Sequence, residues 1–538
     1  MHRRAGVLPV APAARVRDRA AARRLHRGSR RAAPGVIQAG TRRIGSPTLP
    51  SPEGGWKNER RPMMARLRVS TWSALAVGIG FLLSEAIMLD ARIRDYDEGV
   101  YWATFRALAR GEPMFSTVFA TSPPGFFYAL LPFYLVVQSL ASLRAGVLLL
   151  CLAGLAATYV MGRLLAGNLG GLVAVLLSAT SSVYWHESTV LQADGPSLAL
   201  STVAVALAML AVRTEGRGRD ALAAAAGLAL AFSVGTKFFG VVAAVPIAIV
   251  LLGASRGRAR LVTVAVLGGV LGLLILLVPI IGSPQAAYKQ LIVSHLRAGE
   301  LAHFGIGRNL SYVFLRHELP LEALGFVGAV VALIRRDRTV VMPLAWAVVS
   351  MIAILGYEPI FPHHLVLLTP SLALLAALGV ANVGGIARPA FVIAAVLVIG
   401  TAAVGVAADT REAIRTLAPD LHDAEMTAAV RAHGQPHDAW FTDNAYAVAA
   451  ADRDIPGPVV DTSGQLALAG LLTVSDLERT RVRYDVKWVL VDNGRLERFP
   501  GFHAWLLAHF HPVQRLGGGA VIYEAGTATA AHLSTEFG

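Results

Sequence analysis

Residues 70–102 read STWSALAVGIGFLLSEAIMLDARIRDYDEGVYW. The first part, residues 70–89, is apolar and has about the 20 residues that a helix needs to cross a lipid bilayer. An acidic segment follows almost at once, with Asp95, Asp97 and Glu98 within four positions. The stretch therefore predicts a membrane-spanning helix that brings carboxylates to the edge of the bilayer.

Composition extends this expectation to most of the chain. Hydrophobic residues make up 55% of the 538 residues and charged residues only 16%, whereas soluble domains carry about 25% charged residues. Apolar runs of spanning or nearly spanning length recur up to residue 408. We predict about eleven spans, at residues 70–89, 145–161, 169–188, 196–212, 221–235, 238–252, 261–281, 321–334, 340–355, 365–381 and 390–408.

The net positive charge of the chain comes from its beginning. Residues 1–69 hold 17 Lys or Arg and 3 Asp or Glu, and so account for the whole net charge of +14. This segment has no apolar periodicity, and we interpret it as a disordered basic cytoplasmic tail. Because the rest of the chain carries no net charge, the composition gives no support to a nucleic-acid partner. No short apolar core with a cleavage site precedes residue 70, so we expect the first span to remain as an anchor.

The short loops between the spans set the predicted orientation. Arginines gather in the loops at residues 213–220, 255–260 and 335–338, whereas residues 186–195 and 357–364 contain no Lys or Arg. Since positively charged loops stay in the cytoplasm, the N-terminus should be cytoplasmic. An odd number of spans then places the C-terminal part of the chain on the extracytoplasmic side.

Two further segments complete the predicted architecture. If the aromatic-rich residues 124–140 spanned the membrane, every later loop would change sides and the arginine-rich loops would leave the cytoplasm. We therefore expect this segment to lie along the outer interface or to be re-entrant. After residue 409, amphipathic stretches at 421–433 and 502–511 alternate with short apolar runs at 487–491 and 520–523. The predicted fold is an all-α polytopic membrane domain at 70–408 followed by a small extracytoplasmic α/β domain at 409–538.

The acidic segment after the first span suggests chemistry. Ionisable groups near lipid are costly and usually face a polar cavity. Transfer of a sugar from a polyprenyl phosphate needs a carboxylate to take the proton from the attacking hydroxyl, and Asp97 or Glu98 fits that role. The alternative is a solvated acidic cluster that caps a helix.

The order of these features resembles a known superfamily. A first span, the pair Asp97 and Glu98, the aromatic Tyr101 and the pair Pro123 and Pro124 are similar to the GT-C glycosyltransferases. Within that superfamily the chain resembles the protein O-mannosyltransferase and ArnT-like group, which includes RgtA/B/C/D-like enzymes. The resemblance covers about residues 70–400, and it implies that Asp97 is the catalytic base and that Glu98 supports Asp97 or orients substrate.

Four more residues match this group. Asp194 resembles its outer-loop aspartate, Lys237 follows a Gly-Thr pair in the middle of the membrane domain, and His363 and His364 precede a late span. Many relatives have Arg-Tyr where this chain has His363 and His364. The resemblance implies substrate-binding roles for Tyr101, Asp194, Lys237, His363 and His364.

Lys237 also stands out without the resemblance, because it is a basic residue at an outer membrane edge. A lysine there can pair with a phosphate and stabilise it as a leaving group, or it can simply extend toward the interface. Asp194 can equally be a helix N-cap, and the two histidines can cap a helix start. Arginines, histidines and aromatic residues in the outer loop at 283–320 could line an entrance for an anionic lipid.

No cofactor is predicted. Cys151 is the only cysteine, and the histidines show no recognised ligand spacing, so a divalent metal has no support. The expected partners are membrane lipid, a polyprenyl-phosphate sugar donor and an extracytoplasmic glycan, lipid or protein acceptor. Two other functions stay open: a membrane transporter or lipid flippase, and a noncatalytic assembly or sensor protein.

Overall fold

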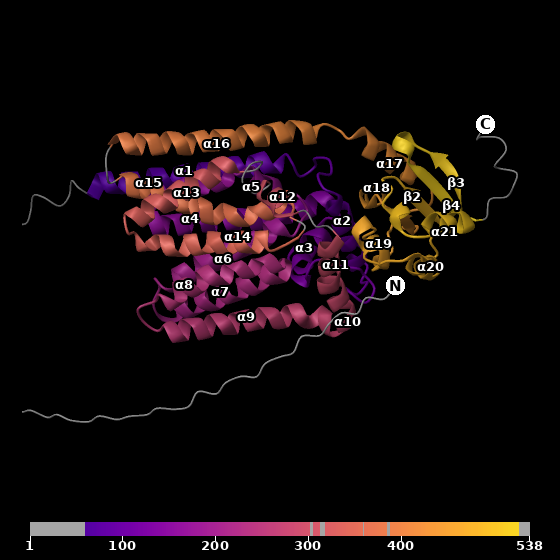
Figure 1. Ribbon diagram of the computed structural model, residues 1–538, viewed down its shortest axis with the longest axis horizontal. Coiled ribbons are helices and arrows are strands. Elements are labelled where there is room, and N and C mark those ends of the chain that lie inside the picture. Colours follow the sequence, from indigo (N-terminus) through magenta and orange to yellow (C-terminus); the bar gives the residue numbers. More distant parts are fainter. Residues whose placement is uncertain (1–59, 302–304, 312–317, 359, 385–387, 527–538) are drawn as a thin grey trace, which may run out of the picture. The chain divides into compact units, whose positions relative to one another are not determined.

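A computed structural model describes residues 60–301, 305–311, 318–358, 360–384 and 388–526. Residues from Arg60 onwards form one compact unit. The predicted disordered tail therefore lies outside the described residues up to Glu59, and residues 60–69 already belong to the first helix. The chain is mostly helical, with a small sheet near its C-terminal end (Figure 1).

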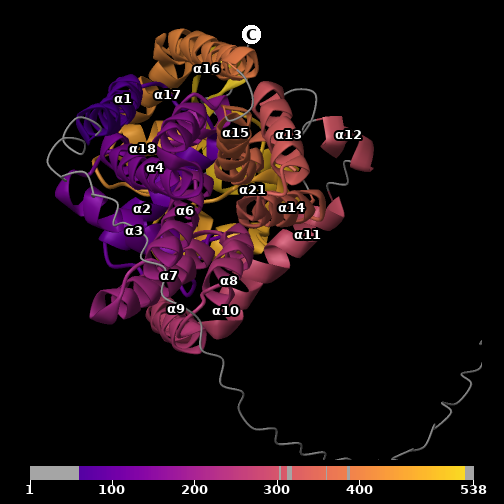
Figure 2. The same ribbon diagram turned by 90° about the vertical axis from the view of Figure 1, so that its left-hand side faces the viewer.

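The membrane part is a bundle of apolar helices whose axes run side by side (Figures 1 and 2). In chain order they are α1 (Arg60–Ala86), α4 (Leu140–Ala179), α6 (Asp194–Ala211), α7 (Gly216–Thr236), α8 (Ala244–Leu252), α9 (Arg258–Ile281), α13 (Leu319–Ile334), α14 (Val341–Leu355), α15 (Thr369–Gly384) and α16 (Arg388–Leu417).

These helices confirm a polytopic membrane fold. Among the described residues, six helices are long and apolar enough to cross a membrane by themselves, and three shorter ones are apolar. Each of the eleven predicted spans overlaps at least one helix, but the number of spans remains a prediction. The six long helices begin at Leu140, Asp194, Arg258, Arg338, Pro362 and Arg388, and the last three of them include α14, α15 and α16.

Helix α4 contains two of the predicted spans. Its backbone leaves the helical region at Ala166 and Gly167, and Gly167 has φ of 72°, a conformation that glycine adopts without steric cost. A Cβ atom on Gly162 would lie 2.7 Å from the carbonyl oxygen of Gly170. The two halves therefore pack closely against each other on either side of this turn.

The predicted span at 169–188 was too long. Helix α4 ends at Ala179, and the short helix α5 (Ser182–Glu187) follows. The Ser181 hydroxyl accepts a hydrogen bond from the Tyr184 backbone N–H at 3.2 Å, which is how an N-cap starts a new helix. The apolar residues of α5 made the run appear continuous in the sequence.

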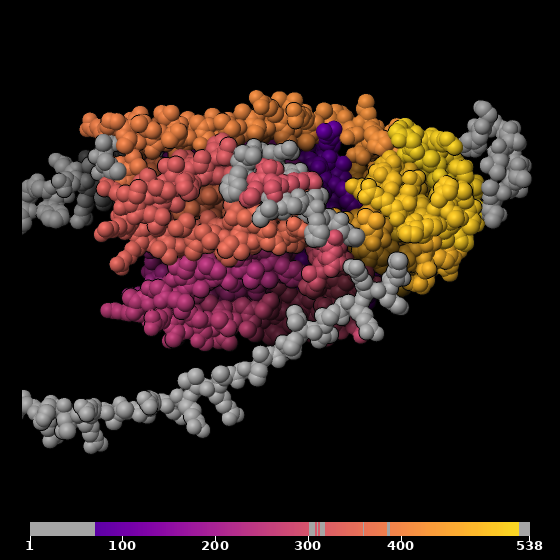
Figure 3. Space-filling view, viewed as in Figure 1, coloured from indigo at the N-terminus to yellow at the C-terminus, as the bar shows by residue number. Residues whose placement is uncertain are grey.

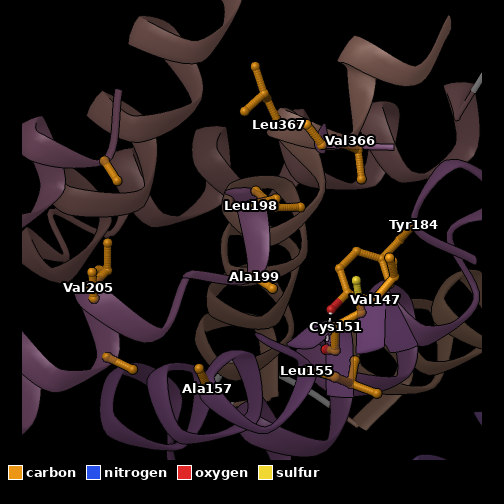
Figure 4. Close-up of a cluster of buried hydrophobic side chains, with 14 of the residues drawn as sticks. Val147, Cys151, Leu155, Ala157, Tyr184, Leu198, Ala199, Val205, Val366 and Leu367 are labelled. Atoms are coloured by element: carbon orange, nitrogen blue, oxygen red, sulfur yellow. Dashed lines mark hydrogen bonds between the residues drawn. The ribbon is translucent and has the colours of Figure 1, made fainter. Parts of the chain in front are cut away.

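Figure 4 shows part of the core where α4, α5 and α6 meet. The Tyr184 hydroxyl donates a hydrogen bond to the Cys151 carbonyl oxygen at 2.6 Å, and Cys151 itself is buried. A Cβ atom on Gly154 would lie 2.9 Å from Cα of Ala199. Small residues thus allow α4 and α6 to approach closely and fix the level at which α6 begins.

Short helices cover one end of the bundle. The chain leaves α1 through a loop to α2 (Tyr96–Ala109) and α3 (Pro124–Val136). The segment after α9 adds α10 (Pro284–Tyr288), η2 (Lys289–Val293), α11 (Ser294–Leu301) and α12 (Gly305–Ser311). Helix α3 has 13 residues, and its location along the outer interface or as a re-entrant segment remains a prediction. In the outer loop at 283–320, His303 and Arg316 lie outside the described residues.

The C-terminal part is an α/β unit, as predicted. Its sheet has the order β1-β2-β4-β3, with β1 parallel to β2 and the other pairs antiparallel. The strands are β1 (Trp440–Thr442), β2 (Trp488–Val491), β3 (Phe510–Arg515) and β4 (Val521–Ala525), and the helices are α17 (Leu421–Ala432), α18 (Ala445–Ala450), α19 (Gly464–Leu468), α20 (Val474–Tyr484) and α21 (Phe502–His509).

This α/β unit shares its core with the membrane part. Val100, Ala103 and Ala107 of α2 are buried in the same hydrophobic cluster as the strands β1 and β2. A Cβ atom on Gly99 would lie 2.6 Å from the backbone nitrogen of Tyr446 in α18. In Figure 3 the yellow C-terminal residues gather at the end of the bundle where α2 lies. Helix α2, which carries Asp97, is thus held between the two parts, while a domain boundary at residue 409 remains a prediction.

Candidate active site

Asp97 lies in the first turn of α2. The carboxylate of Asp95 caps this helix and accepts a hydrogen bond from the Asp97 backbone N–H at 2.9 Å. Among the described residues, none donates a hydrogen bond to the Asp97 carboxylate. Burial, followed by the negative charges of Asp95 and Asp461, raises the pKa of Asp97 to about 8, while the Lys237 charge opposes this shift. Asp97 is thus a partly buried carboxyl that faces other charged groups.

Glu98 has a different environment from Asp97. It is fully buried, and its two carboxylate oxygens accept hydrogen bonds from the Arg144 guanidinium at 2.9 and 2.8 Å. The backbone N–H groups of Arg94 and Leu191 bind the same carboxylate. This bidentate pair joins the start of α2 to α4 and to the loop before α6. Arg144 was not singled out in the sequence, although a lone arginine at the start of an apolar run was a visible signal.

Tyr101 connects α2 to the Pro-Pro segment. Its hydroxyl lies 2.8 Å from the Ser122 hydroxyl, and its ring packs edge-on against Phe126 at 4.8 Å between centroids. A Cβ atom on Gly125 would lie 2.6 Å from the carbonyl group of Gly235 near the end of α7. Helix α3, against which Tyr101 of α2 packs, therefore lies directly beside the segment that presents Lys237.

Lys237 lies just after α7, where Asp194 of α6 meets it. The Lys237 ammonium forms an ion pair with the Asp194 carboxylate, which is 5% exposed. The ammonium also lies 5.8 Å from the centroid of the Phe239 ring. Asp194 makes no N-cap hydrogen bond for α6, so its side chain serves the ion pair instead.

The two histidines lie in η5 (Pro362–Leu368), beside Asp194. The His363 Nε2 atom is 4.0 Å from the Asp194 carboxylate, and its ring stacks on Phe361. His364 accepts a hydrogen bond at Nδ1 from the Phe361 backbone N–H at 3.3 Å, so it caps the helix start as the alternative interpretation proposed. This bond leaves the proton of a neutral His364 on Nε2, which makes that nitrogen a hydrogen-bond donor.

Within the described part of the chain, one group of residues has the side chains of a metal site. Ligand atoms of Asp194, His363 and His364 all lie within 4.8 Å of one another. Two features oppose a cation there: Asp194 already pairs with Lys237, and the His364 hydrogen bond at Nδ1 leaves Nε2 protonated. A metal ligand must present an unprotonated nitrogen, so the arrangement suits anion binding better than metal binding.

A cavity of about 610 Å³ borders this group. Asp95 and His363 lie at its wall, and its other polar residues include His186, Glu187 and Glu412. Apolar lining comes from α4, the start of α13 and α16, through Leu177, Leu321, Val404, Gly405 and Ala408. Of residues 95–140, only Asp95 lines this cavity.

Further groups near the site were not expected from the sequence. Glu187 is fully buried, and neither of its carboxylate oxygens has a hydrogen-bond partner among the described residues. Burial and the charge of Asp194 raise the pKa of Glu187 well above its usual range. From the C-terminal part, Asp461 acts on Asp97, and the Arg495 guanidinium lies 3.6 Å from the centroid of the Tyr96 ring. Neither residue belongs to a recognisable motif, so only the folded chain reveals them.

A sequence comparison and a structural comparison with known proteins point to the same kind of protein. Residues 121–282 match the family of dolichyl-phosphate-mannose-protein mannosyltransferases. No curated protein matches the chain. The structure of this chain is similar to that of ArnT from Cupriavidus metallidurans in the apo state. The two chains share 14% sequence identity and a TM-score of 0.61, and the match covers 86% of this chain and 98% of ArnT.

ArnT bound to undecaprenyl phosphate gives 13% identity and a TM-score of 0.59, with coverage of 85% of this chain and 98% of ArnT. An oligosaccharyltransferase from Archaeoglobus fulgidus gives 14% identity and a TM-score of 0.51, with coverage of 85% and 73%. The chain thus has the fold of the GT-C glycosyltransferases. The sequence match and the shared fold confirm the resemblance to the ArnT-like and protein mannosyltransferase group.

Proposed function

We propose that this protein transfers a sugar from a polyprenyl-phosphate donor to an extracytoplasmic acceptor, with Asp97 as the general base. The observation that carries the proposal is the position of Lys237. Its ammonium is paired with Asp194, its charge lowers the pKa of Asp97, and the same Asp194 carboxylate lies 4.0 Å from His363 Nε2. A site for both a phosphate and an attacking hydroxyl needs this combination of cation and base.

The donor phosphate would bind at Lys237. A phosphate can replace Asp194 as the partner of the Lys237 ammonium, and the His364 Nε2–H can donate a hydrogen bond to it. Undecaprenyl phosphate is bound in a structure of ArnT, a protein of the same fold. The neighbouring cavity, with its apolar wall from α4, α13 and α16, offers space for the isoprenoid part of such a donor.

The chemical step is a displacement at the anomeric carbon. The acceptor hydroxyl oxygen forms a bond to that carbon while the bond between the carbon and the phosphate oxygen breaks. Asp97 takes the hydroxyl proton, and the phosphate leaves with the electron pair, stabilised by Lys237. One displacement inverts the configuration of the sugar. Glu98, held by Arg144, supports the position of α2 and hence of Asp97.

Replacement of Asp97 tests this function. In cells that lack the protein, wild type should restore a sugar on a cell-envelope acceptor that is measured by mass spectrometry, whereas Asp97→Asn should not. Loss of a general base typically costs about 10²–10⁴-fold in rate. Asp90→Asn is the control, because Asp90 is an exposed carboxylate in the same loop. Full restoration by Asp97→Asn, with both variants folded in detergent, would refute the assignment.

A further inference from the structure

The cavity of about 610 Å³ has a polar wall in addition to its apolar one. The polar side chains come from the loop before α2, from α5, from the segment before α13, from η5 and from α16. Four of them are acidic, namely Asp95, Glu187, Glu318 and Glu412, and within the described part of the chain no Lys or Arg lines the cavity. A ligand on this side of the cavity therefore meets negatively charged groups.

Two contacts place the polar wall beside the ion pair that we propose as the phosphate site. His363 lines the cavity, and its Nε2 atom is 4.0 Å from the Asp194 carboxylate. A Cβ atom on Gly195 would lie 2.3 Å from the Glu187 carbonyl oxygen, so the end of α5 packs directly against the first turn of α6. The cavity therefore lies next to Asp194, the partner of Lys237.

His186 of α5 is oriented by Glu412 of α16, a helix that runs along the outside of the bundle (Figures 1 and 2). The His186 Nδ1 atom is hydrogen-bonded to the Glu412 carboxylate. Because an ionised carboxylate only accepts hydrogen bonds, Nδ1 carries the proton of a neutral ring and Nε2 keeps a free lone pair. Both side chains line the cavity and are about one-third exposed. The pair of His186 and Glu412 thus offers hydrogen-bond acceptors to a ligand.

Glu187 adds an acceptor that has no partner. It lines the same cavity, and one of its carboxylate oxygens is 4.0 Å from His186 Nε2. The side chain is fully buried, and neither oxygen has a hydrogen-bond partner among the described residues. Buried polar groups are nearly always paired in folded proteins. An unpaired carboxylate at a cavity wall is therefore a sign that a donor comes from the ligand.

The hydroxyl groups of the wall are engaged in contacts with the protein. The Thr180 hydroxyl donates to the Leu176 carbonyl oxygen at 2.8 Å. The Ser181 hydroxyl oxygen lies 3.3 Å from that of Thr369 and also accepts from the Tyr184 backbone N–H. The polar wall is thus rich in acceptors and poor in donors, and it is complementary to a ligand with several hydroxyl groups.

Building on the proposed function, we infer that this polar wall binds the sugar of the donor, and that this sugar carries hydroxyl groups but no carboxylate. The sugar is bonded directly to the phosphate, so a phosphate at Lys237 brings the ring to the cavity. Its hydroxyl groups can donate to His186 Nε2 and to the Glu412 carboxylate. A uronic acid would instead bring a like charge among the four acidic residues, which repel it.

This role makes His186 and Glu412 specificity-determining residues for the donor. The isoprenoid part of the donor would follow the apolar wall of the same cavity, and Asp97 remains the base. The inference concerns only the sugar, so it can fail while the proposed transfer reaction stands.

The chemical class of the transferred sugar is the first test. Cell envelopes from cells that lack the protein and from cells that express it are compared by mass spectrometry. We expect the added mass to be that of a sugar without a carboxylate, such as a pentose or a hexose. A transferred uronic acid would overturn the inference and leave the proposed function intact.

The second test uses variants of the pair. His186→Gln and Glu412→Gln should each decrease the product about 10- to 100-fold, as for a lost hydrogen bond to an ionised group. Glu300→Gln is the matched control, because Glu300 is an exposed glutamate of α11 that does not line the cavity. Its product should equal that of wild type.

A binding measurement separates the sugar from the phosphate and from folding. Undecaprenyl phosphate, which carries no sugar, should raise the melting temperature of purified His186→Gln and Glu412→Gln in detergent as much as that of wild type. Lys237→Gln should lose this stabilisation, because it lacks the cation that holds the phosphate.

Two results with the variants would overturn the inference. One is full product from both His186→Gln and Glu412→Gln. The other is loss of stabilisation by undecaprenyl phosphate in these variants, because the pair would then serve the phosphate or the fold rather than the sugar. Product that persists in Asp97→Asn would instead refute the proposed base, and the absence of any added sugar with wild type would overturn both proposals.

Discussion

At the scale of residues, two adjacent carboxylates have opposite environments. Glu98 accepts hydrogen bonds from four donors, which include Nε and Nη2 of the Arg144 guanidinium. The pKa of Asp97 is raised by its burial and by the charges of Asp95 and Asp461, and it is lowered by the charge of Lys237. Burial with a bidentate partner keeps Glu98 ionised, while burial beside like charges favours a proton on Asp97. The pair therefore separates into a structural anion and a group that exchanges protons.

The raised pKa of Asp97 predicts how transfer depends on pH. A base acts only when it is deprotonated, so a pKa of about 8 means that transfer is slow at pH 6 and rises as the pH passes 8. Replacing Lys237 by Gln removes the charge that lowers this pKa, so the midpoint of the remaining activity should move upward. Initial rates of transfer in membranes between pH 6 and 10 would measure both. A midpoint below pH 6 in wild type would contradict the assignment.

The buried ion pair predicts a large effect on stability. Replacing Arg144 by Met leaves Glu98 buried without its cation, a change that typically costs about 3–5 kcal/mol. The melting temperature in detergent should fall clearly for Arg144→Met. Arg163→Met is the control, since Arg163 is exposed at the turn of α4. Equal melting temperatures for the two variants would show that the pair is not needed for the fold.

At the scale of elements, the sequence predicted the helices of the membrane part best. The positions of the spanning helices followed from apolar runs, because every backbone polar group in a bilayer has to be satisfied within a helix. The end of α4 was misplaced because the Ser181 cap lies inside an apolar run. The contacts of α2 with α18 and with Thr462 were not predictable, because they join residues more than 300 positions apart in the sequence.

The contact between α2 and α18 can be tested at Gly99. A methyl group on Gly99 would meet the Tyr446 backbone nitrogen at 2.6 Å, so Gly99→Ala must displace one helix. Overpacking of this kind typically costs about 1–3 kcal/mol, and movement of α2 should also slow transfer. Gly78→Ala is the control, because Gly78 has open space around its Cβ position. Wild-type melting and transfer for Gly99→Ala would show that this contact does not position Asp97.

At the scale of the whole molecule, the predicted orientation has a direct test. The only native cysteine, Cys151, is buried, so a single introduced cysteine can be labelled selectively. Asp485→Cys in the C-terminal part should react with a membrane-impermeant maleimide in intact cells. Arg217→Cys, in a loop predicted to be cytoplasmic, should react only after the membrane is opened. The reverse labelling pattern would invert the predicted topology.

The candidate site shows the same division between what the sequence indicates and what folding adds. Asp97, Tyr101, Asp194, Lys237, His363 and His364 were named from their positions relative to the spans, and the structure brings them to one end of the bundle. Their partners Arg144, Asp461 and Arg495 come from long-range packing that no local pattern encodes. The roles of all these residues remain predictions until they are measured.

The central claim is that Lys237 holds a lipid phosphate beside Asp97. A cryo-EM structure of the protein with undecaprenyl phosphate would test it most directly. The account predicts phosphate density within hydrogen-bonding distance of the Lys237 ammonium, with the Asp194 ion pair opened and the Asp97 carboxylate facing the same space. Phosphate bound away from Lys237, or on the side of the membrane opposite Asp97, would contradict it.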